Sequence, residues 1–187
     1  MGKIFLYDIF NHWQSNGSIF IYSDPHFSDE DMKEIRTNYI DDEEQIKRIN
    51  SVLGKYDTII FLGDIGNVEC IKKIRGYKVL IKGNHDLGDT LYKEYFNEVY
   101  RGSLTINDKI ILSHQPRGTL PYEFNIHGHI HNINWKNDDN HFNCCAECIN
   151  YTPIRLDEII CKCKVNKIKT IHRYFTDIAK EDKNEIL

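Results

Sequence analysis

The segment Thr58-Ile59-Ile60-Phe61-Leu62-Gly63-Asp64 decides the expected fold. Its apolar, β-branched run is typical of a buried strand, and Gly63-Asp64 ends that strand at a turn. A second strand is expected from Tyr77 to Ile81, and it leads into Gly83-Asn84-His85-Asp86. With a short helix over Val68 to Ile74 between them, the two strands give the β-α-β order of a layered α/β protein.

The same alternation extends in both directions from this unit. Upstream, hydrophobic spacing predicts two helices between Asp29 and Leu53, with a break near Tyr39. The other expected elements are a hairpin of Lys3 to Phe10 with Ser18 to Ser23, a helix over Thr90 to Phe96, a hairpin of Ser103 to Ile106 with Lys109 to Ser113, strands over Phe124 to Gly128 and His141 to Ala146, and helices over Pro153 to Ile160 and Lys167 to Leu187.

Length and composition indicate one globular domain over residues 1–187. Residues 1–17 are expected to be an N-terminal hairpin addition and residues 165–187 a C-terminal helix. The chain is 41% hydrophobic, its net charge is -4, and its mean hydropathy is -0.51, so it lacks the basic character of a general nucleic-acid binder. Neither a secretory signal nor a membrane span is recognisable, which predicts a cytoplasmic protein without a membrane partner. The oligomeric state is left open.

Six cysteines raise the alternatives of a disulfide framework, a zinc site and ordinary thiols. They are Cys70, Cys144, Cys145, Cys148, Cys161 and Cys163. A cytoplasmic location argues against disulfides. Strand alternation through Phe142, Cys144 and Ala146 would place Cys145 and Cys148 on opposite faces, which argues against a shared zinc ion. Reduced, partly buried thiols are therefore expected.

Five polar motifs follow expected strands. They are Asp24-Pro25-His26, Gly63-Asp64, Gly83-Asn84-His85-Asp86, His114 and Gly128-His129-Ile130-His131. Loops outside the carboxyl ends of strands are where α/β proteins bind ligands, so these motifs can converge. Imidazole and carboxylate donors without thiolate are typical of catalytic metal sites. Seven of these side chains are candidate ligands, which is too many for one tetrahedral ion but suits two ions about 3.5–4 Å apart. Two divalent cations leave the centre with a net positive charge, which attracts phosphoryl oxygens.

In this order the motifs resemble those of the calcineurin-like metallophosphoesterase superfamily. The resemblance spans Asp24 to His131, and residues Asn150 to Ile159 resemble the tail of a small bacterial and phage branch of phosphoesterases. It implies an α/β fold, specifically a four-layer α/β/β/α sandwich of two mixed sheets with flanking helices.

The resemblance also implies a role for each motif residue. Two divalent metal ions, drawn from Mn, Fe, Zn, Co and Ni, would be bound, and a hydroxide bridging them would attack phosphorus. The first ion would be held by Asp24, His26 and His131, the second by Asn84, His114 and His129, with Asp64 bridging both. His85 would contact the phosphoryl or leaving oxygen, and Asp86 could orient His85.

Two features of the sequence bear on substrate recognition. Pro25 and Phe27-Ser28 depart from the branch pattern, which affects the lip of the site and not its ligands. Arg36 stands where the branch usually has an arginine, so it is a candidate substrate contact, with a solvated helix position as the alternative. Arg117, three residues after His114, is a second candidate at the rim.

The expected function is hydrolysis of a small phosphomonoester or phosphodiester. One alternative is a nuclease, for which the only sequence support is a basic cluster, and which the net negative charge disfavours. That cluster comprises Lys162, Lys164, Lys167, Lys169 and Arg173. The other alternative is a non-catalytic interaction module on the same fold, which the complete ligand set and His85 disfavour.

Overall fold

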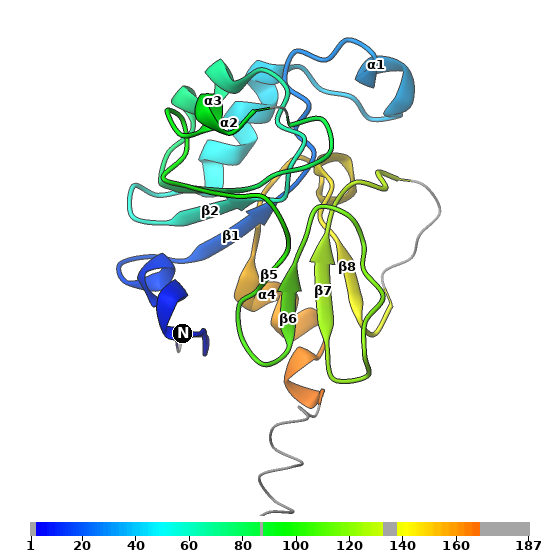
Figure 1. Cartoon of the computed structure of the whole chain (residues 1–187). Coiled ribbons are helices and arrows are strands. Elements are labelled where there is room, and N and C mark those ends of the chain that lie inside the picture. Colours follow the sequence, from blue (N-terminus) through cyan, green and yellow to red (C-terminus); the bar gives the residue numbers. More distant parts are fainter. Residues whose placement is uncertain (1–2, 87, 133–137, 169–187) are drawn as a thin grey trace, which may run out of the picture.

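A five-stranded sheet forms one half of the molecule (Figure 1). The computed structural model describes residues 3–86, 88–132 and 138–168. The sheet order is β4-β3-β2-β1-β9, with β1 to β4 parallel and β9 antiparallel to β1. Its strands are β1 (Ile19–Tyr22), β2 (Thr58–Phe61), β3 (Tyr77–Ile81), β4 (Glu98–Tyr100) and β9 (Ile154–Arg155). The first three were expected from the sequence, and β4 and β9 were not.

The second sheet has four strands in the order β5-β6-β7-β8. They are β5 (Leu104–Thr105), β6 (Ile110–Leu112), β7 (Phe124–His127) and β8 (His141–Asn143). The expected hairpin is confirmed: β5 and β6 are antiparallel, and Asn107 at the turn accepts from the main-chain N–H groups of Lys109 and Ile110. β6, β7 and β8 run parallel. Both sheets are mixed and are flanked by helices, which is the α/β sandwich that the resemblance implied.

Alternating side chains divide the apolar residues between two cores. Ile21 and Ile60 face the core that the two sheets share, whereas Tyr22 and Phe61 face the core under the outer helices. All residues of β1 and β2 are buried because both faces of the sheet are covered. The strands that carry the motifs therefore lie in the centre of the protein, and only their ends reach the surface.

Short helices cover the outer face of the five-stranded sheet (Figure 1). Two of them, α1 (Met32–Ile35) and α2 (Asp42–Val52), confirm the expected pair with a break. Asp41 caps α2 by accepting from the N–H of Glu44 over 2.8 Å, while Ile46 and Ile49 pack inward. The 3-10 helix η2 (Val68–Lys73) and the single-turn α3 (Asp89–Tyr92) occupy the other two expected helical positions.

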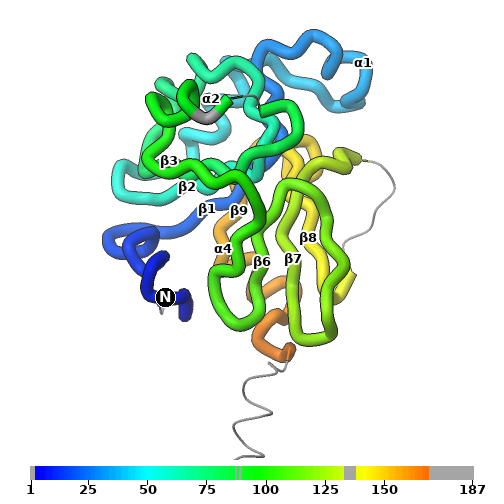
Figure 2. The backbone as a smooth tube through the Cα atoms, viewed as in Figure 1, coloured from blue at the N-terminus to red at the C-terminus, as the bar shows by residue number. Residues whose placement is uncertain are grey.

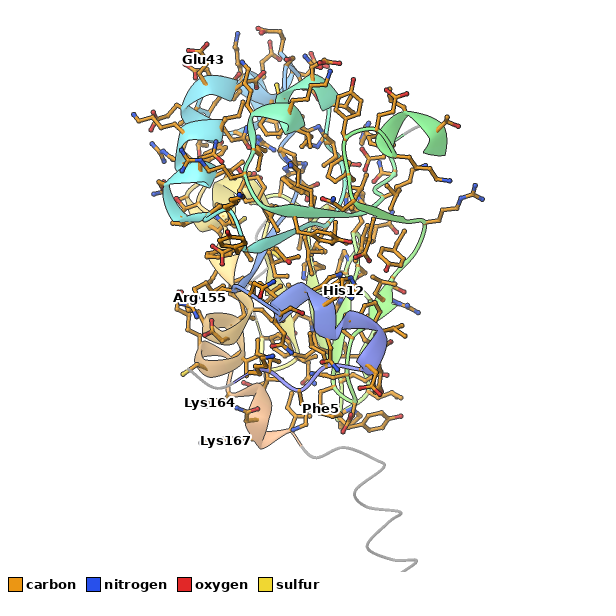
Figure 3. All side chains as sticks on the ribbon, turned by 90° about the vertical axis from the view of Figure 1, so that its left-hand side faces the viewer. Phe5, His12, Glu43, Arg155, Lys164 and Lys167 are labelled. Atoms are coloured by element: carbon orange, nitrogen blue, oxygen red, sulfur yellow. The ribbon has the colours of Figure 1, made fainter. Side chains whose placement is uncertain are left out.

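The expected N-terminal hairpin is wrong. Residues 3–7 form no strand, and a 3-10 helix, η1 (Asp8–Gln14), follows them. Phe10 and Trp13 are buried three residues apart, which is helical spacing. The His12 ring and the Trp13 indole both bond to Oε1 of Glu98, at 2.6 and 2.9 Å, so this segment is fastened beside β4. Figure 3 shows η1 lying along the side of the molecule, with His12 on it.

The C-terminal part begins with a strand and not with the expected helix. Ile154 and Arg155 pair with β1, and α4 (Leu156–Lys162) starts after them (Figure 2). A short 3-10 helix, η4 (Val165–Lys167), follows, and the expected tail helix lies almost entirely outside the described residues.

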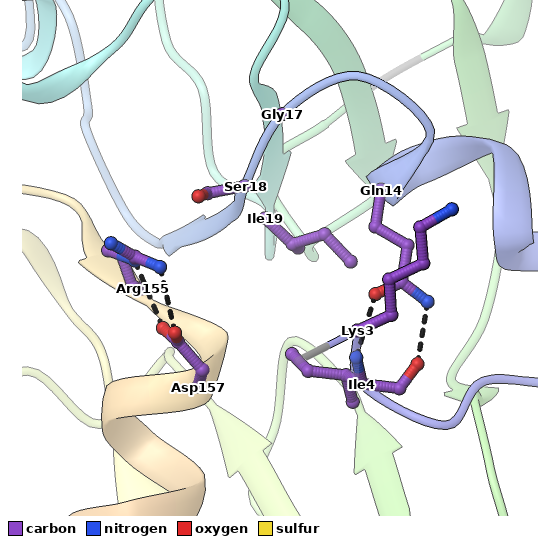
Figure 4. A pocket seen from close by; sticks show the side chains of 8 residues that line it. All are labelled: Lys3, Ile4, Gln14, Gly17, Ser18, Ile19, Arg155 and Asp157. Carbon is purple, nitrogen blue, oxygen red and sulfur yellow. Dashed lines mark hydrogen bonds and ion pairs between the residues drawn. The ribbon is translucent and has the colours of Figure 1, made fainter. Parts of the chain in front are cut away.

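A small depression of about 110 Å³ lies beside the start of β1. Arg155 and Asp157 line one side of it, and Ile4 and Gln14 line the other (Figure 4). No helix among the described residues is long and apolar enough to cross a membrane.

Candidate metal centre

The five motifs converge at one edge of the sandwich. Asp24, Asp64 and Asn84 follow β1, β2 and β3, while His114 and the pair His129 and His131 follow β6 and β7. These strands are parallel within each sheet, so their carboxyl ends lie at the same edge. A parallel bridge between Ser23 and Cys145 ties the ends of the two sheets together.

The first group of ligand atoms comes from Asp24, His26 and His131. Oδ1 of Asp24 lies 4.0 Å from Nε2 of His26 and 4.0 Å from Nε2 of His131. Asp24 is fully buried, yet its Oδ1 has no hydrogen-bond partner, and neither has Nε2 of His26. Its Oδ2, in contrast, accepts from Ser23 Oγ, the His129 N–H and Cys145 Sγ. The protein thus holds one oxygen of Asp24 in place and leaves the other for a ligand.

The second group comes from Asp64, His114 and His129. Nε2 of His114 lies 3.3 Å from Oδ2 of Asp64, 3.1 Å from Nδ1 of His129 and 2.8 Å from Oδ1 of Asn84. The two groups adjoin at Asp64, because the same Oδ2 is also 3.7 Å from Nε2 of His26. Oδ1 of Asp64 accepts from the N–H of His85 over 2.9 Å, which fixes the orientation of the carboxylate.

The hydrogen bonds of His114 test whether a cation fits here. Its Nδ1 lies 2.7 Å from the carbonyl oxygen of Leu62 and must donate to it. In the neutral ring Nε2 then carries a lone pair, which faces the oxygens of Asn84 and Asp64. Several lone pairs that point at one another repel unless a proton or a cation lies among them. The residues therefore fit a cation.

The other two imidazoles that face the carboxylates are held in the same way. Nδ1 of His26 lies 3.1 Å from Asp29, and Nδ1 of His131 lies 2.8 Å from Glu147. Each carboxylate fixes the tautomer in which Nε2 is a lone-pair donor that faces Asp24. All donors are nitrogen or oxygen, a set that is consistent with divalent metal ions.

Burial and charge act in opposite directions on these histidines. Burial is the largest influence on His26 and lowers its pKa, even though Asp24 and Asp64 act to raise it. Burial also acts to lower the pKa of His114, but the hydrogen bond to Asp64 and the charges of Asp24 and Asp64 outweigh it, so that pKa is raised. The same balance raises the pKa of His131, with Glu147 as the main opposing group.

The backbone at the candidate ligands is left-handed. Five ligands have positive φ, an uncommon conformation for non-glycine residues: Asp24 at 54°, His26 at 47°, Asp64 at 53°, His129 at 69° and His131 at 48°. Such conformations cluster at functional sites. Gly128 lets the strands come this close, because a Cβ there would lie 2.1 Å from Oδ2 of Asp24.

His85 and Asp86 differ from one another in their surroundings. The His85 ring is exposed and lies edge-on to His26, with ring centroids 5.6 Å apart. Asp86 was expected to orient that ring, but its carboxylate accepts instead from the N–H groups of Asp64, Ile65 and Gly83 and from the hydroxyl of Tyr92. Asp86 therefore ties the loops after β2 and β3 together, and none of these hydrogen bonds involves the ring of His85.

Arg36 is buried and does not reach the surface. It is 3% exposed, and its guanidinium donates to the carbonyl oxygens of Asp24 and Pro25. Nε lies 3.2 Å from Oε2 of Glu147. This position contradicts both the substrate contact and the solvated helix residue that the sequence suggested. The guanidinium supports the loop that carries Asp24 and His26.

Glu147 is the residue that sequence reasoning missed. Its carboxylate is buried between His131 and Arg36. Burial acts to raise its pKa, but the hydrogen bond from His131 and the charge of Arg36 outweigh this, so the pKa of Glu147 is lowered and the group is ionised at neutral pH. No local motif marks Glu147, because its partners are brought to it only by the tertiary fold.

The cysteines are free thiols, as expected, but the strand alternation that was used to place them is wrong. β8 ends at Asn143, and residues Ala146–Ile149 form a 3-10 helix. Cys145 is buried and donates to Oδ2 of Asp24 over 3.4 Å, and burial raises the pKa of its thiol well above the ordinary value. Cys145 lies within reach of His131 and Glu147, but its thiol bonds to Asp24, while His131 and Glu147 bond to each other.

Arg117 lies at the rim, where the sequence suggested. It lines a depression together with Asn84 and His114, and its guanidinium donates to the hydroxyl of Ser103. The metal-ligand residues that the sequence predicted are thus brought together, His85 and Arg117 lie beside them, and Asp86 and Arg36 lie beneath them.

Two solved structures are similar to this chain. The protein of unknown function AQ665 from Aquifex aeolicus is 27% identical, and the match covers 76% of this chain and 97% of that one with a TM-score of 0.63. Pseudomonas putida nuclease MPE is 21% identical, and the match covers 60% of this chain and 61% of that one with a TM-score of 0.44. No protein-family model and no curated protein matches the chain.

Proposed function

We propose that this chain is a phosphoesterase that uses two divalent metal ions to hydrolyse small phosphomonoesters or phosphodiesters. The observation that carries the proposal is the pair of adjoining ligand groups, one around Asp24 and one around His114, with Oδ2 of Asp64 lying 3.7 Å from Nε2 of His26 in the first and 3.3 Å from Nε2 of His114 in the second. Two ions about 3.5–4 Å apart are the arrangement found in many phosphatases and nucleases. With nitrogen and oxygen donors alone, Mn, Fe, Co, Ni and Zn are the candidate metals, and Mn is the first to test.

The side chains around the ligands have separate tasks. When bound, the metal ions polarise the phosphoryl oxygens and activate a water molecule. His85 is exposed beside His26 and is free to donate a proton to the departing oxygen. Asp64 holds the main chain of His85 through its Oδ1, so the proposed acid and the shared ligand are positioned together.

The basic cluster that favoured a nuclease lies away from this edge. Its described members lie at the end of α4, in η4 and between these two helices. Lys109, which directly precedes β6, donates to the carbonyl oxygen of Val165 in η4. The cluster is therefore beside the start of β6, whereas His114 follows the end of that strand. Lys164 and Lys167 lie together near one end of the molecule in Figure 3. They give no support to a nuclease groove at the metal centre.

The test is hydrolysis of p-nitrophenyl phosphate and bis(p-nitrophenyl) phosphate. Protein stripped with a chelator should be inactive, and added manganese should restore turnover. Asp64→Asn should abolish this restoration, because one shared ligand is lost while asparagine tolerates the left-handed backbone. Asp139→Asn, at an exposed position outside the ligand groups, is the matched control and should behave like the unmodified protein. Turnover that persists in Asp64→Asn protein, or that never depends on metal, would refute the proposal.

A further inference from the structure

The surface around the candidate metal centre is electrostatically uneven. Near His26, a depression of about 390 Å³ is lined by four acidic residues, and its one lining cation, Lys33, is paired with Glu30. The four are Glu30, Asp41, Asp42 and Glu43. A second depression, of about 320 Å³, is lined in part by Asn84 and His114. Among the described residues that line this second depression, none is acidic, and Lys82 and Arg117 are basic.

Arg117 is held at this depression by its main chain. Its N–H donates to Oδ1 of Asn125 over 2.8 Å, and its carbonyl oxygen accepts from the ring of His141 over 2.8 Å. Asn125 is fully buried in β7, and its side-chain amide donates to Ile111 and Ser113 in turn. The main chain of Arg117 is therefore fixed to β7, the strand that positions His129 and His131.

The guanidinium of Arg117 has capacity left for a ligand. Among the described residues it makes one donation, from Nη1 to the hydroxyl of Ser103, which also lines the depression. No carboxylate of a described residue lies within 4.0 Å of it, in contrast to the buried guanidinium of Arg36. A guanidinium has five N–H donors in a planar fork that matches phosphate oxygens. A nearby hydroxyl adds another donor.

We propose that this depression, which we call the Arg117 subsite, binds a second phosphate group of the substrate. The inference rests on the proposed function, since the first phosphate would lie at the metal centre next to Asn84 and His114. The substrate class is then a phosphate ester with a further phosphate on the side of β6 and β7. The acidic depression near His26 repels a second phosphate, so the charges also fix the direction in which the substrate lies.

A matched pair of chromogenic esters tests the subsite. Thymidine 5′-(p-nitrophenyl phosphate) and the same compound with a 3′-phosphate differ only in the second phosphate. With manganese present, kcat/KM should be higher for the 3′-phosphorylated ester. Arg117→Gln should lower kcat/KM for that ester by about 10-fold or more and change the other by less than about twofold, as expected for a lost charge-assisted hydrogen bond. An equal loss on both esters, or no preference in the unmodified protein, would overturn the proposal.

The matched control is Arg75→Gln. Arg75 is exposed and lies just before β3, at the opposite end of that strand from Gly83 and Asn84. Arg75→Gln should leave kcat/KM unchanged for both esters. If neither ester is hydrolysed, the phosphoesterase proposal fails by itself, and calorimetry with manganese then decides the subsite. Thymidine 3′,5′-bisphosphate should bind more tightly than thymidine 5′-monophosphate to the unmodified protein, but not to Arg117→Gln protein, and equal binding of both would overturn the subsite.

The second phosphate could belong to a polynucleotide or to a small bisphosphorylated molecule. Inhibition by single-stranded oligothymidylates of increasing length separates these sources. Inhibition that strengthens with length supports a strand that continues past the Arg117 subsite. Inhibition equal to that of thymidine 3′,5′-bisphosphate supports a small molecule with two phosphates. Absence of inhibition by either compound would overturn the subsite.

Discussion

Glu147 accepts a hydrogen bond from Nδ1 of His131 over 2.8 Å, and its other oxygen lies 3.2 Å from Nε of Arg36. Arg36 in turn donates to the carbonyl oxygen of Asp24. Two of the three residues of the first ligand group are therefore connected through one buried ion pair. A carboxylate in this position fixes the ring orientation of a metal-binding histidine and raises its basicity.

Replacing Glu147 with glutamine should weaken metal binding at the first group. The amide keeps the shape of the side chain but removes its charge from both His131 and Arg36. Loss of such a supporting carboxylate typically costs about 10–100-fold in metal affinity. Calorimetric titration with manganese should show one weakened site and one site that is unchanged.

The control for this variant is Glu158→Gln, because Glu158 is an exposed residue of α4 that makes only a loose ion pair with Lys162, at 3.9 Å. It should bind metal like the unmodified protein. Unchanged binding in Glu147→Gln protein would show that His131 is oriented without this carboxylate.

Metal stoichiometry should distinguish the shared ligand from a ligand of one group. Oδ2 of Asp64 lies 3.7 Å from Nε2 of His26 and 3.3 Å from Nε2 of His114. Asp64→Asn should therefore lower occupancy at both groups, whereas His131→Ala should lower it mainly at the first. Elemental analysis after dialysis measures the number of metal ions per chain in each variant. Two fully occupied ions in Asp64→Asn protein would contradict the shared role of Asp64.

The convergence of the candidate ligands could be predicted from sequence because it depends on local features. Each motif follows a short apolar strand, and the carboxyl ends of parallel strands share one edge whatever the details of packing. The residues that support the ligands could not be predicted in this way. Arg36 and Glu147 are far apart along the chain, so the sequence suggested a substrate contact or a solvated position for Arg36 and marked Glu147 not at all, and only the fold brings the two together.

The errors at the N-terminus have a similar origin. The run from Lys3 to Phe10 is short and apolar enough to suit a strand, but no described strand pairs with it. What fixes the segment is Glu98, which accepts hydrogen bonds from Trp13, Tyr77 and Tyr100 as well as contacting His12. Because Glu98 lies in β4, its hydrogen bonds to the N-terminal segment leave no periodic pattern in the sequence of that segment.

That anchor should make stability depend on pH. Burial acts to raise the pKa of Glu98, but the hydrogen bonds from His12, Tyr100, Trp13 and Tyr77 outweigh it, so its pKa in the folded state is lowered. The unfolded value is about 4.3. The stabilisation is then fully present above about pH 4.3 and is lost as pH falls through the lower folded pKa.

Glu98→Gln should accordingly destabilise the protein by roughly 1.5–3 kcal/mol at pH 7, the range for hydrogen bonds to a charged group. The difference from the unmodified protein should shrink as the pH is lowered below about 4. Urea unfolding at a series of pH values measures both quantities. Glu94→Gln, at an exposed position, is the matched control. A difference that stays constant down to low pH would contradict a role for the ionised carboxylate.

His85 offers the clearest separation of binding from catalysis. Its ring is exposed next to His26, and it is the main-chain N–H of His85 that donates to Asp64, so no candidate ligand is positioned by the imidazole. His85→Ala should keep both metal ions and lose rate, by about 10²–10⁴-fold if the ring acts as a general acid. The loss should be greatest for alkyl phosphates, whose leaving oxygen needs a proton, and smaller for nitrophenyl esters. His12→Ala, the same change at an exposed ring on η1, should leave the rates unaltered. An equal loss on both ester types would indicate that His85 stabilises phosphoryl charge, and a loss of metal would place it among the ligands.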